Sequence, residues 1–586
     1  MKKHLILIIF VILAAYAGSL SSGFVYDDFA IIVHNNFIKS WRNIYMLFSQ
    51  RYISHPMEVI FNMDTYNIGA GESTYRPVAT LSYFLNYRLF KLNPWGYRLT
   101  NIVLHIINAI LIYFLIRLLF KKDNLALCSA VLFGIHPVNA EVLNCTAFRP
   151  NILVFLFSLT SIFLYFKYKD ASGNRQKPFF LLLSLFSFLL ALFSKEIAFI
   201  LPVALILCDL FYIKFDFKKI FTNFRIYILY FLVDAFYLVV YFFIFTPTLK
   251  ITQSFELYNG VLSMFDVLGR YLQYMALPVS LIPRELGAPL LLISYWRIVF
   301  AIGVATLCVY LVVRRWRHMP EISFSILWFF IWLLPINNFL YSLRIPIAFR
   351  FLYIPILGFS IALAVLLIKI WDRNSRFLPA LLLLRRALVI LVFGYFLLFT
   401  ISGNIIWKNE LVFYSFAIEK YPLSTNAHSA LGATFAKYGE RHEAQKEFNT
   451  VLSLSQNRNL FMPFPYALAS AYLGGFYLAD GEYSRAEQMY LQALEVFPHS
   501  ARIYTELGNC YQKQGLYKKS LEYFKEAKKI NPRFTPAYIN SGITYELMHK
   551  YLAAKQEWEL ALEIYPGATE ARVLLSGLTD IINQGD

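Results

Sequence analysis

Charged residues are scarce in this chain of 586 residues. Only 15% of them are Asp, Glu, Lys or Arg, whereas 58% are hydrophobic and 18% are aromatic. Soluble globular domains carry about 25% charged residues, so the composition excludes an ordinary soluble protein. The sequence instead predicts a polytopic membrane protein with a soluble part attached.

Acidic residues are the scarcer of the charged kinds. The chain has 36 Asp and Glu against 54 Lys and Arg, which gives a formal net charge of +18. Such an excess can serve nucleic-acid binding. Here, however, Lys and Arg fall mostly in short loops between apolar runs, as in the cytoplasmic loops of membrane proteins. We assign the charge to membrane topology and expect no nucleic-acid partner.

Cysteines are few, and several common catalytic motifs are absent. The chain has no P-loop, no Rossmann glycine motif and no HExxH, so nucleotide chemistry and zinc proteolysis have no support. Its five cysteines are scattered and form neither CxxC pairs nor a disulfide framework: Cys128, Cys145, Cys208, Cys308 and Cys510.

Long apolar runs predict about eleven membrane spans, with the basic loops inside. The expected spans are residues 4–20, 99–120, 124–143, 150–168, 179–195, 197–213, 226–246, 290–313, 322–340, 351–370 and 379–403. The segment from Val261 to Leu281 has polar residues on one face, which favours an interfacial helix. If it spans, the C-terminal half inverts. An odd number of spans places everything after Asn404 on the exported side.

Two adjacent acids, Asp27 and Asp28, follow the first apolar run. Ala15-Tyr16-Ala17 resembles a signal-peptidase site, but with or without cleavage the acids end on the exported side. An Asp pair can simply cap a helix or lie in solvent. At this position it can also serve a reaction whose other substrate is held in lipid. The hydrophilic stretch 21–98 is long enough to hold short helices on the membrane surface.

The C-terminal part is a repeat with a period of 34 residues. Four columns keep this spacing: Gly474, Gly508, Gly542; Tyr477, Tyr511, Tyr545; Ala493, Ala527, Ala561; and Pro498, Pro532, Pro566. This period is typical of tetratricopeptide (TPR) repeats, which are paired helices stacked into a solenoid with a concave groove. We expect a further unit at Asn426–Leu454 and a capping helix at Thr569–Asn583. The predicted domains are 1–407 in the membrane and 408–586 in the solenoid.

Ionisable side chains gather at the exported ends of the predicted spans, where they are costly and therefore candidates for function. Any one of them can instead be a cap, a snorkelling side chain or a structural ion pair. The candidates are Arg76, His136, Glu141, Arg149, Lys195, Glu196, Arg344 and Arg350, with His105 inside the second span.

These groups together fit transfer of a sugar from a lipid phosphate. Cations such as Arg350, Lys195 and Arg149 can hold the phosphate and stabilise the charge that develops on it. A carboxylate outside the membrane can take the proton of an acceptor hydroxyl. Because phosphate leaves without a general acid, one base suffices for an inverting displacement. Asp27 or Asp28 is the candidate base.

The order of motifs resembles a known family. Phe24-Val25-Tyr26-Asp27-Asp28, Tyr75-Arg76-Pro77, His136-Pro137 with Glu141, Ser194-Lys195-Glu196 and the TPR repeats follow one another as in the transmembrane-and-TPR-containing (TMTC) protein O-mannosyltransferases of the GT-C superfamily. The resemblance covers nearly the whole chain, although the distinct motifs lie in the first two hundred residues and in the repeats.

The resemblance implies an all-α GT-C helix bundle followed by a TPR solenoid. It also implies a polyprenyl-phosphate-mannose donor and transfer to Ser or Thr hydroxyls of an exported protein, with Asp27 and Asp28 at the acidic-motif positions. Arg76, His105, His136, Glu141, Arg149, Lys195, Glu196, Arg344 and Arg350 are candidates for binding the donor. Two adjacent Asp residues make a poor metal cage, so no metal is expected to be required.

The chain differs from animal members of that family. It has four or five repeats, and its Lys/Phe/Ile-rich composition and short N-terminus are typical of a bacterial protein. The expected location is therefore a bacterial inner membrane, or an ER-like membrane in a eukaryote, with the active site and repeats on the exported side. Two alternatives remain: a ligase or polymerase of the O-antigen type, and a non-catalytic membrane-anchored TPR scaffold.

Overall fold

The computed structural model describes residues 1–48, 75–173, 175–244, 257–279, 281–283, 294–336, 347–372, 379–458, 460–565 and 567–584. The described residues contain helices and turns but no strand, so the chain is all-α as predicted. The chain divides into two units at Phe413 and Tyr414. Each unit is described by itself.

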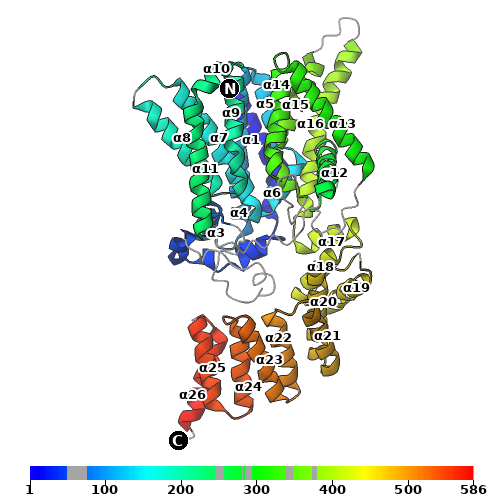
Figure 1. Ribbon diagram of the computed structural model, residues 1–586. Helices are drawn as coiled ribbons and strands as arrows, with labels where there is room; N and C mark the ends of the chain where they lie inside the picture. Colours follow the sequence, from blue (N-terminus) through cyan, green and yellow to red (C-terminus); the bar gives the residue numbers. More distant parts are fainter. Residues whose placement is uncertain are drawn as a thin grey trace. The chain divides into compact units, whose positions relative to one another are not determined.

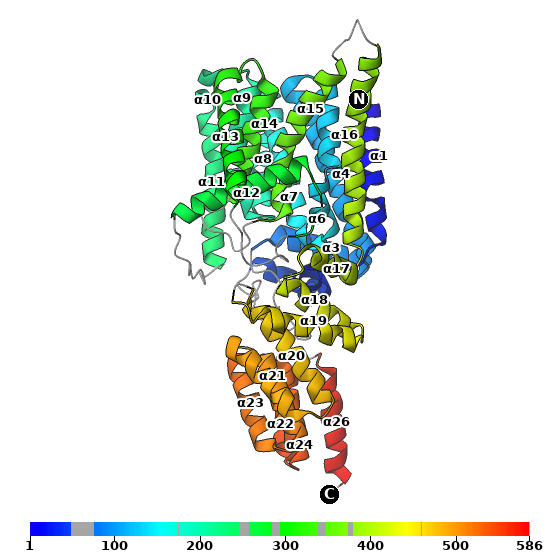
Figure 2. The ribbon, with the colours of Figure 1, turned by 90° about the vertical axis from the view of Figure 1, so that its right-hand side faces the viewer.

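The first unit is a bundle of roughly parallel apolar helices (Figure 1). Its helices are α1 (Lys2–Tyr16), α3 (Pro77–Phe90), α4 (Pro94–Phe120), α5 (Asp123–Gly134), α6 (Ala140–Asn144), α7 (Arg149–Asp170), α8 (Gln176–Leu192), α9 (Leu201–Tyr212), α10 (Phe217–Thr222), α11 (Phe224–Ile244), α12 (Leu257–Ala276), α13 (Tyr295–Arg315), α14 (Pro320–Leu333), α15 (Ile356–Asp372) and α16 (Pro379–Ile406), followed by α17 (Glu410–Lys420). Although distant in sequence, α1 and α16 lie side by side (Figure 2).

Six helices in the described ranges are long and apolar enough to cross a membrane alone: Lys2–Ser21, Pro94–Phe120, Thr146–Asp170, Phe224–Phe243, Tyr295–Arg315 and Leu383–Ile406. The pair Asp123–Gly134 and Pro137–Asn144, bent by 46°, makes a seventh if it is one span. The other four predicted spans correspond to α8, α9, α14 and α15, which have 17, 12, 14 and 17 residues. At about 1.5 Å per residue these helices are shorter than the apolar core of a bilayer. The structure therefore supports an integral membrane protein with six or seven spans.

The two ends of the bundle differ in charge. The N-terminus and the basic connections meet at one end, where Arg117 contacts Met1 and Lys122 forms a 2.5 Å ion pair with Glu321. At the opposite end, the backbone N–H of Gly23 donates to the carbonyl of Lys408 at 2.9 Å.

The loop after α1 is built from short helical turns, as the sequence predicted. Turns at Phe29–Val33, Phe37–Lys39 and Trp41–Phe48 follow the acid pair, and α3 begins at Pro77, where proline fits the first helical turn. Residues 49–74 of this predicted loop lie outside the described residues.

Helix α12 is absent from the candidate spans, as an interfacial helix should be. Its polar face does not lie in solvent, because Asp266 and Arg270 are 2% and 5% exposed. Asp266 accepts hydrogen bonds from Arg270 at 2.7 Å and from Arg297 of α13 at 2.8 Å. The polar stripe thus attaches α12 to α13.

The second unit contains four helix pairs and a terminal helix: α18 (Thr425–Lys437) with α19 (Arg441–Leu454), α20 (Pro463–Ala479) with α21 (Tyr483–Val496), α22 (Ala501–Lys513) with α23 (Tyr517–Ile530), α24 (Thr535–Leu547) with α25 (Tyr551–Ile564), and α26 (Thr569–Gln584). The 34-residue columns mark close contacts within each pair. A Cβ added to Gly508 would lie 2.5 Å from the ring of Phe524, and one added to Gly542 would lie 2.2 Å from the ring of Trp558. The predicted solenoid is confirmed.

Candidate active site

The two acids of the Asp27-Asp28 pair have different surroundings. Asp28 is fully buried and accepts hydrogen bonds from Thr146 Oγ1 and the N–H of Ala147, both at 2.8 Å, and from the N–H of Val25 at 3.2 Å. Burial raises the pKa of Asp28, and the charge of Arg98 opposes this rise. Asp27 is only half-buried. The pair is therefore divided into a structural acid and an accessible one.

Arg98, which sequence reasoning missed, holds the loop in place. It is buried at the start of α4 and donates to the side chain of Asn144 at 3.0 Å and to the carbonyl of Trp407 at 3.2 Å. It also donates to the carbonyl of Gly23. An arginine in the first turns of an otherwise apolar helix was the signal that could have found it.

Glu141 and Arg350 form a buried ion pair close to the accessible acid. Glu141 Oε1 lies 2.7 Å from Arg350 Nη1, and Oε2 accepts the backbone N–H of Arg350 at 3.0 Å. The guanidinium lies 4.3 Å from the ring centre of Phe148, which also contacts the ring of Tyr26. This ring connects Arg350 to the residue that precedes Asp27.

The pKa of the Cys145 thiol is shifted by the same charged groups. Burial raises the pKa of Cys145, Asp28, Asp27 and Glu141 raise it further, and Arg350 lowers it. All four charged groups therefore lie within electrostatic range of one atom.

Lys195 lies between this ion pair and a second one. Its Nζ donates to Asn151 Oδ1 at 2.6 Å and lies 5.5 Å from the ring centre of Phe351, the residue after Arg350. Burial lowers the pKa of Lys195 to about 7, and Arg76 and Arg350 contribute to the shift. Lys195 is 6% exposed, and its side chain makes no further hydrogen bond within the described ranges, which leaves two of the three N–H donors of the ammonium form for a ligand.

The second ion pair joins Arg76, at the start of α3, to Glu196. Arg76 Nη2 lies 2.8 Å from Glu196 Oε1, and Arg76 Nε lies 3.2 Å from Oε2, which is a two-point contact. Burial alone would raise the pKa of Glu196, but Arg76 outweighs it and the pKa is lowered. This pair reaches solvent, because the Glu196 side chain is 42% exposed.

Three predicted donor-binding residues are engaged in hydrogen bonds with the protein itself. Arg149 donates to Asn101 at 2.7 Å and to the carbonyl of Tyr97 at 3.2 Å. His105 bonds Tyr353 and the carbonyl of Gly134, and His136 bonds the carbonyl of Met275 and the N–H of Val138. All three are buried within the helix bundle. Arg344 lies outside the described residues.

The assembled group consists of Asp27, Glu141, Arg350, Lys195, Arg76 and Glu196. We call it the ionic cluster. Its members come from five separate parts of the first unit: the loop after α1, α3, α6, the connection of α8 to α9, and the short helix Phe349–Leu352. A half-buried acid in the same cluster as two buried cations can take a proton from one substrate while the cations hold the anionic group of another.

Two family models match the chain. Residues 77–246 match the dolichyl-phosphate-mannose-protein mannosyltransferase family, and residues 467–533 match the tetratricopeptide repeat. A protein O-mannosyl-transferase of Caenorhabditis elegans is 24% identical over 467 residues, which is 77% of this chain and 63% of that protein. Protein O-mannosyl-transferase TMTC1 of Mus musculus is 32% identical over 193 residues, 31% of this chain and 19% of that protein.

Solved structures of TPR proteins are similar to part of the chain. The crystal structure of YrrB, described as a TPR protein with an unusual peptide-binding site, has a TM-score of 0.24 and 19% identity, and the match covers 32% of this chain and 91% of YrrB.

The membrane part is therefore similar, over residues 77–246, to the dolichyl-phosphate-mannose-protein mannosyltransferase family. A segment similar to protein mannosyltransferases is followed by TPR repeats, and this order agrees with the resemblance to the TMTC proteins found in the sequence. The chain spans less than two thirds of the length of the curated relatives reported above.

Proposed function

We propose that this protein is a membrane glycosyltransferase that moves mannose from a polyprenyl-phosphate carrier to a Ser or Thr hydroxyl of an exported protein. The observation that carries the proposal is the ionic cluster, which brings an accessible acid and three cations to one end of the bundle. The family match supports the donor class and the protein acceptor.

The phosphate of the donor is assigned to Lys195 and Arg350, with Arg76 at the more exposed edge. Lys195 has unused N–H donors, and Arg350 is oriented by Glu141. Cations held in a buried setting stabilise the charge that develops on a departing phosphate more strongly than cations in water. Because they supply this charge, the reaction is proposed to need no bound metal.

Asp27 is assigned as the base that accepts the proton of the attacking hydroxyl. Asp28 fits this role less well, because its oxygens already accept hydrogen bonds from Thr146, Ala147 and Val25. Attack on the anomeric carbon opposite the phosphate forms the new glycosidic bond, breaks the bond to phosphate and inverts the configuration. The carrier leaves as polyprenyl phosphate.

The full topology is part of the proposal. Four helices shorter than a bilayer, α8, α9, α14 and α15, connect the basic end to the opposite end and are proposed to complete eleven spans. The ionic cluster and the repeats then share the exported side, in keeping with the position of the basic loops. The repeats are proposed to recruit the acceptor, since TPR solenoids present concave binding surfaces.

The alternatives fit less well. A non-catalytic scaffold would not need buried ion pairs, because burying charged side chains costs desolvation free energy. Enzymes of the O-antigen type are expected to use Arg and His of a large late exported loop, whereas His105 and His136 of this bundle are bonded to protein.

The test is the Asp27→Asn variant, assayed in membranes for mannose transfer from polyprenyl-phosphate-mannose to protein. Loss of a general base lowers rates by about 10²–10⁴-fold, and we expect a fall in this range with donor binding retained. Asp123→Asn, which changes an exposed acid at the opposite end of the bundle, is the matched control. Full activity of Asp27→Asn would overturn the assignment.

A further inference from the structure

The inner face of α11 is a stripe of polar side chains. Tyr227, Tyr230, Asp234 and Tyr237 are 2%, 0%, 8% and 1% exposed, and they recur every three or four residues, which places them on one face. The helix is otherwise mostly exposed and apolar, with Phe231, Leu232, Phe236 and Val239 among its exposed residues. All four buried positions thus carry polar groups into the bundle.

The half of the stripe nearer the basic end is satisfied by protein. The hydroxyl of Tyr227 donates to Asp209 Oδ2 at 2.5 Å, and the hydroxyl of Tyr230 lies 2.6 Å from Ser184 Oγ. These contacts attach α11 to α9 and α8 and account for these two tyrosines.

The other half carries two polar atoms that meet no hydrogen-bond partner among the described residues. Oδ1 of Asp234 and the hydroxyl of Tyr237 are buried, and neither meets a hydrogen-bond partner within the part of the chain that the structure describes. A buried polar atom without a partner is costly, and an acid in an apolar span is expected to have a function. The two residues lie one turn apart on the same face.

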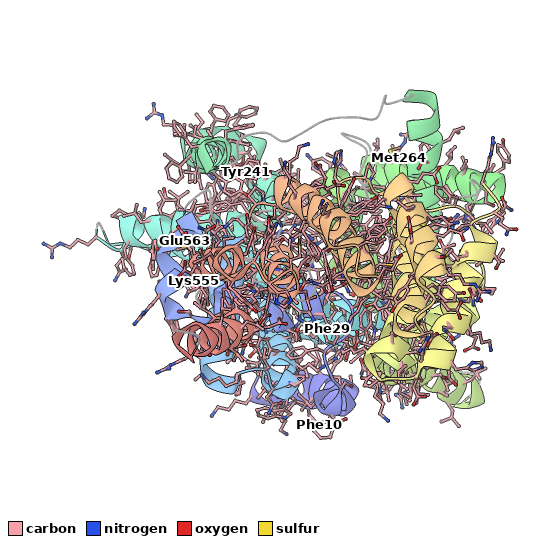
Figure 3. The ribbon with its side chains drawn as sticks, turned by 90° about the horizontal axis from the view of Figure 1, so that it is seen from below. Phe10, Phe29, Tyr241, Met264, Lys555 and Glu563 are labelled. Carbon is pink, nitrogen blue, oxygen red and sulfur yellow. The ribbon has the colours of Figure 1, made fainter. Side chains whose placement is uncertain are left out.

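This unpaired half lies toward the ionic cluster. Tyr237 contacts the rings of Phe193 and Phe199, which flank Lys195 and Glu196 in sequence, at 5.6 and 5.3 Å. Arg76 and Glu196 are within electrostatic range of Tyr237 and of Tyr241, one turn further along. Figure 3 labels Tyr241 on α11 and also Phe29, the residue after Asp28 in the sequence. The ring of Tyr237 therefore packs against the segment that carries Lys195 and Glu196, and Asp234 lies one turn along the helix from it.

We propose that Asp234 and Tyr237 bind hydroxyl groups of the donor's sugar and so select which sugar is transferred. A carboxyl group bonds hydroxyls whether it is ionised or neutral, whereas an ionised carboxylate repels phosphate. A phenol both donates and accepts, as a sugar hydroxyl does. The phosphate has its own cations in Lys195 and Arg350, so the acid and the phenol complement the uncharged part of the same ligand.

This inference rests on the proposed function, and binding of two lipids to the full-length protein in nanodiscs tests it. The probes are polyprenyl-phosphate-mannose and polyprenyl phosphate without sugar. We expect Asp234→Leu and Tyr237→Phe each to weaken binding of the sugar-bearing lipid about five- to tenfold, since each loses about one hydrogen bond. Binding of the sugar-free lipid should change less than about twofold.

The variants should remain folded, because neither removes a partner from another buried group of the protein. Tyr230→Phe is the matched control on the same helix: it removes the contact to Ser184 and should leave binding of both lipids unchanged. Unchanged binding of the sugar-bearing lipid in both stripe variants would overturn the inference, as would an equal loss for both lipids. If the wild-type protein bound neither lipid, the proposed function would fall, and the inference with it.

Discussion

Asp28 is expected to be a stability residue although it adjoins the proposed base. One oxygen of Asp28 accepts from Thr146 and Ala147, and the other accepts from Val25. Asparagine has only one oxygen, because an NH₂ group replaces the other. In Asp28→Asn at least one of these buried donors therefore loses its acceptor. The expected cost is about 1–3 kcal/mol, measured by thermal unfolding of the purified protein in detergent. Asp27→Asn serves as the control and should unfold like the wild type. Equal unfolding temperatures for Asp28→Asn and wild type would contradict this division.

Lys195 is expected to make donor binding depend on pH. Its lowered pKa of about 7 means that in the empty site the ammonium form is present below pH 7 and is lost as the pH rises through it. Because the neutral amine cannot pair with phosphate, the donor should bind up to about tenfold more weakly at pH 8 than at pH 6. Lys195→Arg keeps its charge across this range and should flatten the profile. A flat wild-type profile would contradict the prediction.

At this scale, the sequence predicted which residues carry charge but not what each charge touches. The adjacency of Asp27 and Asp28 is visible in the sequence, whereas their division depends on Thr146 and Ala147, more than a hundred residues away. Arg149 was predicted beside the donor for its charge alone. Its donors are engaged by Asn101 and Tyr97 because helices α4 and α7 pack together, which spacing does not reveal.

Among the elements, the helix pairs of the solenoid offer a sharp packing test. A Cβ added to Gly474 of α20 would lie 2.9 Å from the ring of Tyr490, whereas one added to Gly475 would have its nearest contact at 3.7 Å. We expect Gly474→Ala to destabilise this helix pair by about 1–3 kcal/mol. Gly475→Ala should be neutral or stabilising, since alanine favours helix over glycine by about 1 kcal/mol.

Hydrogen exchange of α20 and α21 in the full-length protein measures both variants, because local opening reports the stability of one helix pair. Equal protection in the two variants would show that the glycine column does not mark tight packing.

The helix pattern shows why some elements were predictable. The repeat has a fixed period, so four columns were enough to place the pairs, and long apolar runs identified α4, α7 and α16. The polar face of α12 was correctly found by its helical spacing. Its partner, Arg297, was not, because a polar stripe facing solvent and one facing a neighbouring helix have the same sequence pattern.

For the molecule as a whole, truncation separates donor use from acceptor use. Ending the chain after Lys420 keeps Phe413, whose ring contacts Trp407 at 4.6 Å and Tyr26 at 5.6 Å, and removes the repeats. We expect donor binding to stay within about twofold of the wild type and transfer to protein to fall at least about tenfold, because the cluster's contacts lie in the first unit. Lipid binding and transfer to protein are measured on the same preparation. Loss of donor binding would contradict this division of labour.

The three bonds of Arg98 have a mechanical consequence. One guanidinium connects Gly23, four residues before Asp27, with Trp407, where the last helix of the bundle has just ended. A pull on the chain beyond Trp407 would therefore reach the acidic loop through Arg98, and also through the hydrogen bond from Gly23 to the carbonyl of Lys408. The acidic loop and the chain that follows α16 are thus fastened at neighbouring points, so tension on that chain would displace the loop.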